Sequence, residues 1–255
     1  MKNEKEYTEG IYIKENKFSA WFDNFWYHYK WHTIISIFLI IVIGICTFQM
    51  CTKKDYDIVL TYAGPKELLT NPQEKININS SLSNASVDQY GEDASANLHS
   101  YIIYSKEQIE ELQKEVDENG KPKYNINTAQ ITKNMQELEA FSQVGDSYIF
   151  LLDPYIYDHL KNQSEISERF VKLSTVFNKK PEASYDECAI KLVDTEFYKN
   201  NPALHVLPDD TLICLHARLV LSTNETQYNK HLEIFKKLAT VSESTKATEI
   251  SKQKA

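Results

Sequence analysis

The sequence predicts one N-terminal transmembrane helix followed by a single α/β domain with a mostly parallel sheet. Three observations indicate this fold class. A charge-free apolar run lies near the N-terminus. Short runs rich in β-branched and aromatic residues then alternate with helical patterns, and residues 56–240 are numerous enough to form a hydrophobic core. Strands that alternate with helices are typical of helices packed on a mainly parallel sheet.

The apolar run predicts a membrane span. Residues 34–46 read IISIFLIIVIGIC and carry no charge. With its flanks the run has about 18 residues, or roughly 27 Å of helix, which is enough to cross the hydrocarbon core. The alternative is a buried helix of a soluble core, but such a helix does not need to be apolar on every face. We therefore expect a transmembrane helix at residues 33–51.

An aromatic belt precedes this span. Trp21, Trp26 and Trp31 stand among phenylalanines, tyrosines and two histidines. Such amphipathic rings are typical of the membrane–water interface. Two interpretations stay open: a short interfacial helix along the membrane within residues 1–32, or the first turns of the spanning helix itself.

The span has the features of an uncleaved signal anchor in a cell membrane. The apolar run begins too late for a cleaved signal peptide, and no small-x-small cleavage site follows it. Lysines flank the span on both sides, so the positive-inside rule does not decide the orientation. Long domains translocate largely regardless of nearby charge. We therefore favour a cytoplasmic N-terminal segment, the lipid bilayer as a partner, and an extracytoplasmic domain over residues 52–240.

The first half of the domain predicts two strands and a helix start. Residues 56–63 (YDIVLTYA) form a strand that Gly64 and Pro65 close. Residues 77–96 suggest a loose helix and a loop, and residues 99–104 (HSYIIY) a second strand. Ser105 is placed as an N-cap with a glutamine at the third helical position, so a charged helix begins there and ends near Asn119 and Gly120.

A helix, a buried strand and another helix start follow. Apolar residues recur at helical spacing from Ile131 to Phe141, and Gly145 is the stop. The run SYIFLL at residues 147–152 is nearly all apolar, as in a strand buried on both faces. Asp153 and Pro154 then supply the N-cap and the first position of the next helix.

The last elements are two strands and a helix. Residues 188–193 and 211–215 are short apolar runs that predict strands, and residues 226–239 predict a helix with one apolar face. Residues 241–255 are mostly polar and are expected to be a disordered tail.

Composition and motifs exclude several functions. A net charge of −8 argues against a nucleic-acid partner, because phosphate binding needs a basic surface. Glycine is scarce, and no nucleotide-binding, hydrolase or zinc-protease signature occurs. The histidines are scattered without metal-ligand spacing. The sequence therefore predicts no cofactor, no metal and no catalytic residues.

Acidic residues at strand ends are the candidate ligand-binding positions. Asp153 and Asp194 each close a strand, and Asp209 with Asp210 precedes another. Open α/β sheets bind ligands beyond the carboxyl ends of their strands. Helix capping and turn formation explain the same residues without a ligand.

Two cysteines in the domain leave a choice between two states. Cys188 and Cys214 could form a disulfide if the domain faces an oxidising compartment. The alternative is a pair of buried free thiols, since cysteine packs as a small hydrophobe.

Several stretches together resemble a known group of proteins. They are DNFWYHYKWHTIISIFLIIV at residues 23–42, DSYIFLLDPYIYDHL at residues 146–160, IKLVDTEFY at residues 190–198 and LPDDTLICL at residues 207–215. They resemble uncharacterised single-span membrane proteins of Gram-positive bacteria. The α/β part is in turn loosely similar to a reduced solute-binding-protein fold, which implies an extracytoplasmic domain that takes a small solute and transfers no catalytic residue.

Three functions follow. The first is a membrane-anchored, non-enzymatic binding or accessory module. The second is a structural or assembly protein that docks on another membrane complex, which abundant tyrosines and the aromatic belt permit. The third is an enzyme with a site around Asp153 and Asp194. We favour the first.

Overall fold

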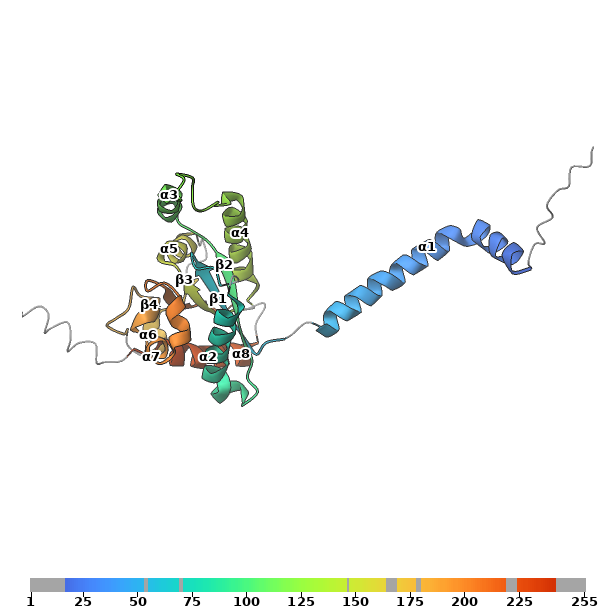
Figure 1. Cartoon of the computed structure of the whole chain (residues 1–255). Coiled ribbons are helices and arrows are strands. Elements are labelled where there is room, and N and C mark those ends of the chain that lie inside the picture. The colour runs from blue at the N-terminus through green and yellow to red at the C-terminus, as the bar shows by residue number, and fades with distance from the viewer. Residues whose placement is uncertain are drawn as a thin grey trace, which may run out of the picture. The chain divides into compact units, whose positions relative to one another are not determined.

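The computed structural model describes residues 17–52, 55–68, 71–145, 147–163, 169–177, 180–218 and 224–241. The chain divides into two compact units, Met1–Asp55 and Tyr56–Ala255. The first unit contains one long helix and the second contains a sheet with its helices (Figure 1). The predicted tail at residues 241–255 lies, except for its first residue, outside the described part of the chain.

Helix α1 (Lys17–Thr52) is apolar and exposed. Within its segment Asn24–Met50, an 18-residue window has a mean hydropathy of 2.4, and none of that window is buried. This segment is long and apolar enough to cross a membrane, which fits a membrane anchor or a signal sequence. A helix of a soluble core would bury such a surface.

The aromatic belt belongs to the same helical element as the apolar run. Trp21, Trp26 and Trp31 are 60%, 42% and 67% exposed. Rings four residues apart stack along the helix: Trp21 on Phe25 at 5.6 Å and Phe25 on Tyr29 at 5.5 Å between centroids. The described residues thus form one helix, as the second interpretation of the belt predicts, with a bend near its N-terminal end (Figure 1).

Five strands form one sheet in the order β2-β1-β3-β5-β4. The strands are β1 (Ile58–Gly64), β2 (Ala96–Ile102), β3 (Ile149–Leu152), β4 (Ala189–Lys191) and β5 (Leu212–Leu215). β1 pairs in parallel with both β2 and β3, whereas β5 runs antiparallel to both β3 and β4. The α/β class is confirmed.

The prediction of a mostly parallel sheet is wrong in its second half, because the sheet is mixed. The chain leaves β4 and enters β5 at the same edge: Lys191 pairs with Leu212, and the Leu192 N–H donates to the Thr211 carbonyl at 2.7 Å. The helical segments between these strands therefore form the loop of a wide hairpin. They do not form the crossover that a parallel pair requires.

Capping residues mark the ends of several helices. The helices of the domain are α2 (Pro72–Tyr90), α3 (Lys106–Lys114), α4 (Thr128–Val144), α5 (Pro154–Asn162), α6 (Leu173–Val176), α7 (Glu196–Asn200) and α8 (Glu225–Ala239), with 3-10 turns η1 (Leu192–Asp194) and η2 (Pro202–Val206). The predicted caps are confirmed: Ser105 forms a full capping box, and the Asp153 carboxylate accepts from the Tyr155 N–H. Gly145 ends α4 with φ of 84°.

The sheet separates two hydrophobic cores. Alternate residues of β1 and β3, such as Leu60 and Leu151, face the core that α2 and α8 complete. Phe150 and Leu152 face the other core, which α4 and α5 cover. Period-two alternation in the strands thus supplies both cores.

Both cysteines of the domain are buried free thiols, so the structure contains no Cys188–Cys214 disulfide. The Cys188 thiol lies 3.6 Å from the Phe170 carbonyl, and the Cys214 thiol lies 3.8 Å from the Phe150 carbonyl. Burial raises the pKa of both thiols. They pack as small hydrophobic groups in the second core.

We predict that the domain loses stability as the pH falls below 6.5, the ordinary pKa of histidine. Burial lowers the pKa of His99, His216 and His231 in the fold. The unfolded chain therefore binds more protons than the native chain on the acid side of that value. Urea denaturation across the pH range should show this loss, and His231→Phe should make it shallower.

His205→Gln is the matched control because His205 is exposed. The acid loss that His99, His216 and His231 cause should persist in this variant. An equally steep acid loss in His231→Phe would contradict the explanation.

We also predict that paired charges in the apolar run abolish membrane retention. Each arginine at the centre of a span costs about 2.5 to 3.5 kcal/mol. The double variant Leu39→Arg/Ile43→Arg should leave the membrane pellet after alkaline carbonate extraction, whereas Leu39→Ile/Ile43→Leu should stay in it. Retention of the arginine variant would argue against a span at this position.

Candidate functional site

The carboxyl ends of four strands meet at one edge of the sheet. β1, β2, β3 and β4 end there, and the antiparallel β5 begins there. The chain passes from β1 to β2 on one side and then returns across β1 to β3 on the other. In open α/β sheets this reversal of strand order leaves a crevice at the carboxyl edge, where ligands bind.

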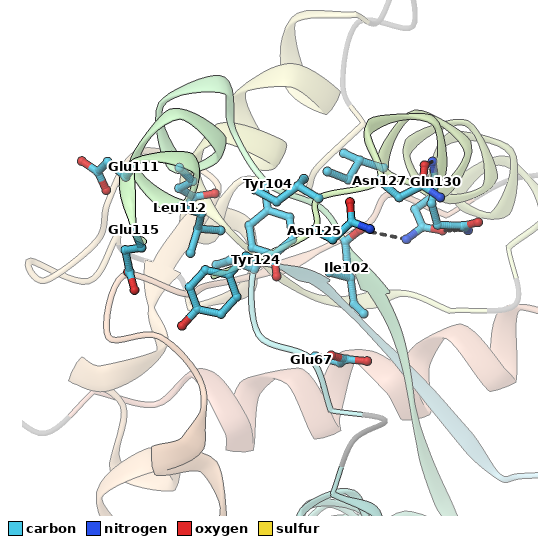
Figure 2. A pocket seen from close by; sticks show the side chains of 15 residues that line it. Glu67, Ile102, Tyr104, Glu111, Leu112, Glu115, Tyr124, Asn125, Asn127 and Gln130 are labelled. Atoms are coloured by element: carbon cyan, nitrogen blue, oxygen red, sulfur yellow. Dashed lines mark hydrogen bonds between the residues drawn. The ribbon is translucent and has the colours of Figure 1, made fainter. Parts of the chain in front are cut away.

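A groove of about 740 Å³ opens at this edge beside β1 and β2 (Figure 2). Its walls come from the loop after β1, the end of β2, helix α3, the first turns of α4 and the segment between these helices. The lining residues are Pro65, Glu67, Ile102, Tyr104, Gln108, Glu111, Leu112, Glu115, Tyr124, Asn125, Ile126, Asn127, Gln130, Ile131 and Asn134. This volume is in the range of small-molecule sites.

The groove is acidic and rich in amides. Glu67, Glu111 and Glu115 contribute three carboxylates, and no lysine, arginine or histidine belongs to the lining. Tyr104 is half-buried, and its pKa is raised by burial and by the nearby Glu67 and Tyr124. Figure 2 shows the Tyr104 and Tyr124 rings between the glutamates of α3 and the amides at the start of α4.

A close contact fixes the loop that leaves β1 for the groove. The Lys66 N–H donates to the hydroxyl of the buried Tyr62 at 3.1 Å. A Cβ atom on Gly64 would lie only 2.6 Å from that hydroxyl, so glycine is required there. The Tyr62 ring thereby positions Pro65 and Glu67 at the rim.

One side of the groove is a thin wall. Residues 106–127, which we call the outer wall, comprise α3, a short hairpin and the segment before α4. None of these residues is buried, and only Gln108, Ile109, Leu112 and Ile126 are half-buried. A segment with so few buried apolar contacts belongs to the low-stability end of a fold.

A polar link holds the outer wall to the sheet edge. The Gln108 side-chain oxygen accepts from the Ser105 N–H at 2.8 Å, and its amide nitrogen donates to Asp153 Oδ2 at 3.0 Å. Asp153 Oδ1 accepts from the Tyr155 N–H at 2.8 Å. One carboxylate thus caps α5 and also anchors α3.

Asp153 is therefore placed beside the groove but does not line it. It is 5% exposed, and burial raises its pKa, which the nearby Asp210 raises further. Both of its oxygens accept bonds from the protein. The structure gives it a supporting role at the site.

Asp194 and Asp209 do not enter the groove lining. Asp194 ends η1 after β4, two strands beyond β3. Asp209 is exposed and accepts a bond from the Tyr198 hydroxyl at 3.4 Å. These acids lie beyond the ends of β3 and β4 and before β5, whereas the groove lies beside β1 and β2 at the other half of the same edge.

Sequence reasoning missed the groove residues themselves. Glu67, Glu111 and Tyr124 come from separate segments and match no motif. The available signal was the high charge of residues 106–116, in which only Ile109, Leu112 and Val116 are apolar, too few for a helix buried in a core.

No group of three or more His, Cys, Asp or Glu side chains among the described residues could hold a metal ion. Comparisons with protein-family models, curated proteins and solved structures found no match. The resemblance to single-span proteins of Gram-positive bacteria therefore stays a prediction.

We predict that Asp153→Ala and Asp153→Asn separate the two roles of this carboxylate. Alanine removes the cap of α5, which costs about 1 kcal/mol, and also the bond to Gln108, for a total of about 2 kcal/mol. Asparagine keeps an oxygen that caps α5, but its amide nitrogen then faces the amide nitrogen of Gln108. Two donors cannot form a hydrogen bond, so the bond to Gln108 is lost. Both variants should speed amide exchange in α3, whereas alanine should give the larger loss in urea denaturation. Unchanged exchange in α3 would rule out the link.

Proposed function

We propose that this chain is a membrane-anchored, non-enzymatic binding module that takes a small ligand in the groove at the sheet edge. The observation that carries the proposal is the groove itself. It lies at the carboxyl edge of the sheet beside β1 and β2, has the volume of a ligand site and is lined by polar and apolar side chains.

The anchor is α1, and the proposed location is a cell membrane with the N-terminus in the cytoplasm. The exposed apolar surface of α1 supports its role as the anchor, because exposing so large an apolar surface to water is unfavourable. The domain, which begins at Tyr56, would then lie outside the membrane. An extracytoplasmic binding domain next to a span suits a module that captures solutes at the cell surface.

A binding role fits the acids of this edge better than catalysis does. The Asp153 carboxylate accepts hydrogen bonds from the Tyr155 N–H and from Gln108, and Asp194 follows β4, which lies two strands from β3. A general acid and base would need positions facing a common substrate. The three groove glutamates lie on exposed surface, outside the water-excluding setting that favours acid–base catalysis.

The proposed likeness to solute-binding proteins is limited to one lobe. Two parallel strands flank β1, with helices on both faces and a crevice at the carboxyl edge. Here the groove lies within one domain, between the sheet edge and the outer wall. Closure would thus involve movement of residues 106–127 toward the sheet rather than of two lobes toward each other.

We predict that a groove ligand raises the melting temperature of the full-length chain in detergent, and that filling the groove removes this effect. Binding to the folded state alone adds about 2.7 kcal/mol at a ligand concentration 100 times Kd. The test screens amines, amino acids, sugars and short peptides against the parent chain. Gln130→Trp places a large ring in the groove from an exposed position on α4.

Gln136→Trp is the matched control, because Gln136 is exposed on the same helix but does not line the groove. It should respond like the parent chain. A stabilising solute that acts equally on both tryptophan variants binds elsewhere, and a screen without any response would count against the proposal.

Orientation is tested by protease treatment of intact cells that carry tags at both ends of the chain. We expect loss of the C-terminal tag and protection of the N-terminal tag. Protection of both tags in intact cells, with loss of both after lysis, would place the domain in the cytoplasm and contradict the proposed location.

A further inference from the structure

We infer that the groove recognises its ligand through a positively charged nitrogen, an ammonium or guanidinium group. This inference rests on the proposed function, because it names the ligand class of the same groove. It draws on the charge of the lining, the aromatic rings within it and the position of one lysine at its rim.

The charge of the lining favours a cation. Its three carboxylates come from two separate segments, Glu67 after β1 and Glu111 with the C-cap residue Glu115 at the end of α3. The lining contains no basic residue, and Lys123 pairs with Glu115 from outside it. Glu111 lies in the last turn of α3 and Glu115 is the C-cap of this helix, so two like charges stand near one helix end and repel. A bound cation would relieve this repulsion, whereas an anion would increase it.

The rings of Tyr104 and Tyr124 also favour a cationic ligand. Both line the groove, and Tyr124 is 41% exposed, so its face is accessible to a ligand. Figure 2 shows the Tyr124 ring close to Glu115, the C-cap of α3, and the Tyr104 ring beside it. Cations are attracted to the negative face of an aromatic ring, and carboxylates beside such rings add Coulombic attraction.

A lysine of the chain already uses this combination. The Lys123 ammonium lies 3.2 Å from Glu115 Oε2 and 5.2 Å from the centroid of the Tyr124 ring. The hairpin holds it there, since the Lys123 N–H donates to the Glu115 carbonyl at 2.9 Å. The rim of the groove therefore binds an ammonium group within the molecule, and Lys123 competes there with a cationic ligand.

The side of the groove formed by the amide side chains of α4 suits the uncharged part of such a ligand. Gln130 donates to Asn134 at 2.8 Å, and Asn134 donates to the Ile102 carbonyl at 2.8 Å, so these side chains hold defined positions. Amides both donate and accept, so they select shape and hydrogen bonding rather than charge. The carboxylates and rings are left to select the charge.

The test is isothermal titration of the full-length chain in nanodiscs of zwitterionic phosphatidylcholine. Spermidine and arginine methyl ester are the cationic probes, glucose is the neutral probe and glutarate is the anionic probe. Ionic strengths of about 0.01 M and 0.15 M change the screening length from roughly 30 Å to 8 Å. The variants are Glu111→Gln and Lys123→Met, and Glu110→Gln is the control because Glu110 is exposed on α3 but outside the lining.

We expect the cationic probes to bind and glutarate not to bind. Glu111→Gln should weaken spermidine binding about threefold to fivefold, the effect of one exposed ion pair. Lys123→Met should strengthen it by a similar factor, and the control should match the parent. Higher ionic strength should weaken the binding of both cations.

Two different failures are distinguishable. If glucose binds as well as spermidine, Glu111→Gln has no effect and Gln130→Trp blocks the binding, the ligand class is wrong while the groove remains the site. If no probe binds in a manner that Gln130→Trp blocks, both the ligand class and the proposed function are contradicted.

Discussion

Two parallel ladders on either side of β1 set the geometry of this domain. Parallel neighbours cannot be joined by a tight turn, so the chain must cross the sheet twice, through α2 on one face and through α3 and α4 toward the other. These crossings bury β1 on both faces and create the two cores. They also make the chain diverge at the carboxyl edge, where the groove opens.

The rest of the domain follows from this centre. β3 leads directly into Asp153, which starts α5 and also holds Gln108 of α3. The chain then crosses from β3 to β4 through α5 and α6, and β5 returns between these two strands as the second strand of the wide β4–β5 hairpin. The firmly packed sheet thus supports a weakly packed outer wall, and the contact between them is mainly polar. A rigid base with a loosely attached wall is an arrangement that suits ligand capture.

Local features of the fold could be predicted from the sequence. Capping at Ser105 and Asp153 depends on side chains within three residues, and buried strands such as SYIFLL are recognisable from composition. The apolar run of α1 needs no long-range information either. The direction of β5 could not be predicted, because it depends on hydrogen bonds such as that of Leu192 with Thr211.

For the candidate site, the sequence predicted the carboxyl edge of the sheet but not the residues that line the groove. Strand-end acids pointed to the carboxyl edge, and Asp153 does support the groove through Gln108. The lining was not predictable, because Glu67 and Glu111 line one groove only after β1 and β2 have paired and α3 has folded back. Lys123 gave no signal in the sequence, since its role depends on the hairpin that brings it to Glu115.

The central claim is that residues 106–127 form the movable wall of a ligand groove. Hydrogen–deuterium exchange of the full-length chain in nanodiscs, with and without spermidine, tests it most directly. We expect these amides to exchange faster than those of β1 without spermidine, and we expect spermidine to slow them while exchange in α8 is unchanged. Exchange as slow as that of β1 without spermidine, or protection only in other parts of the domain, would contradict it.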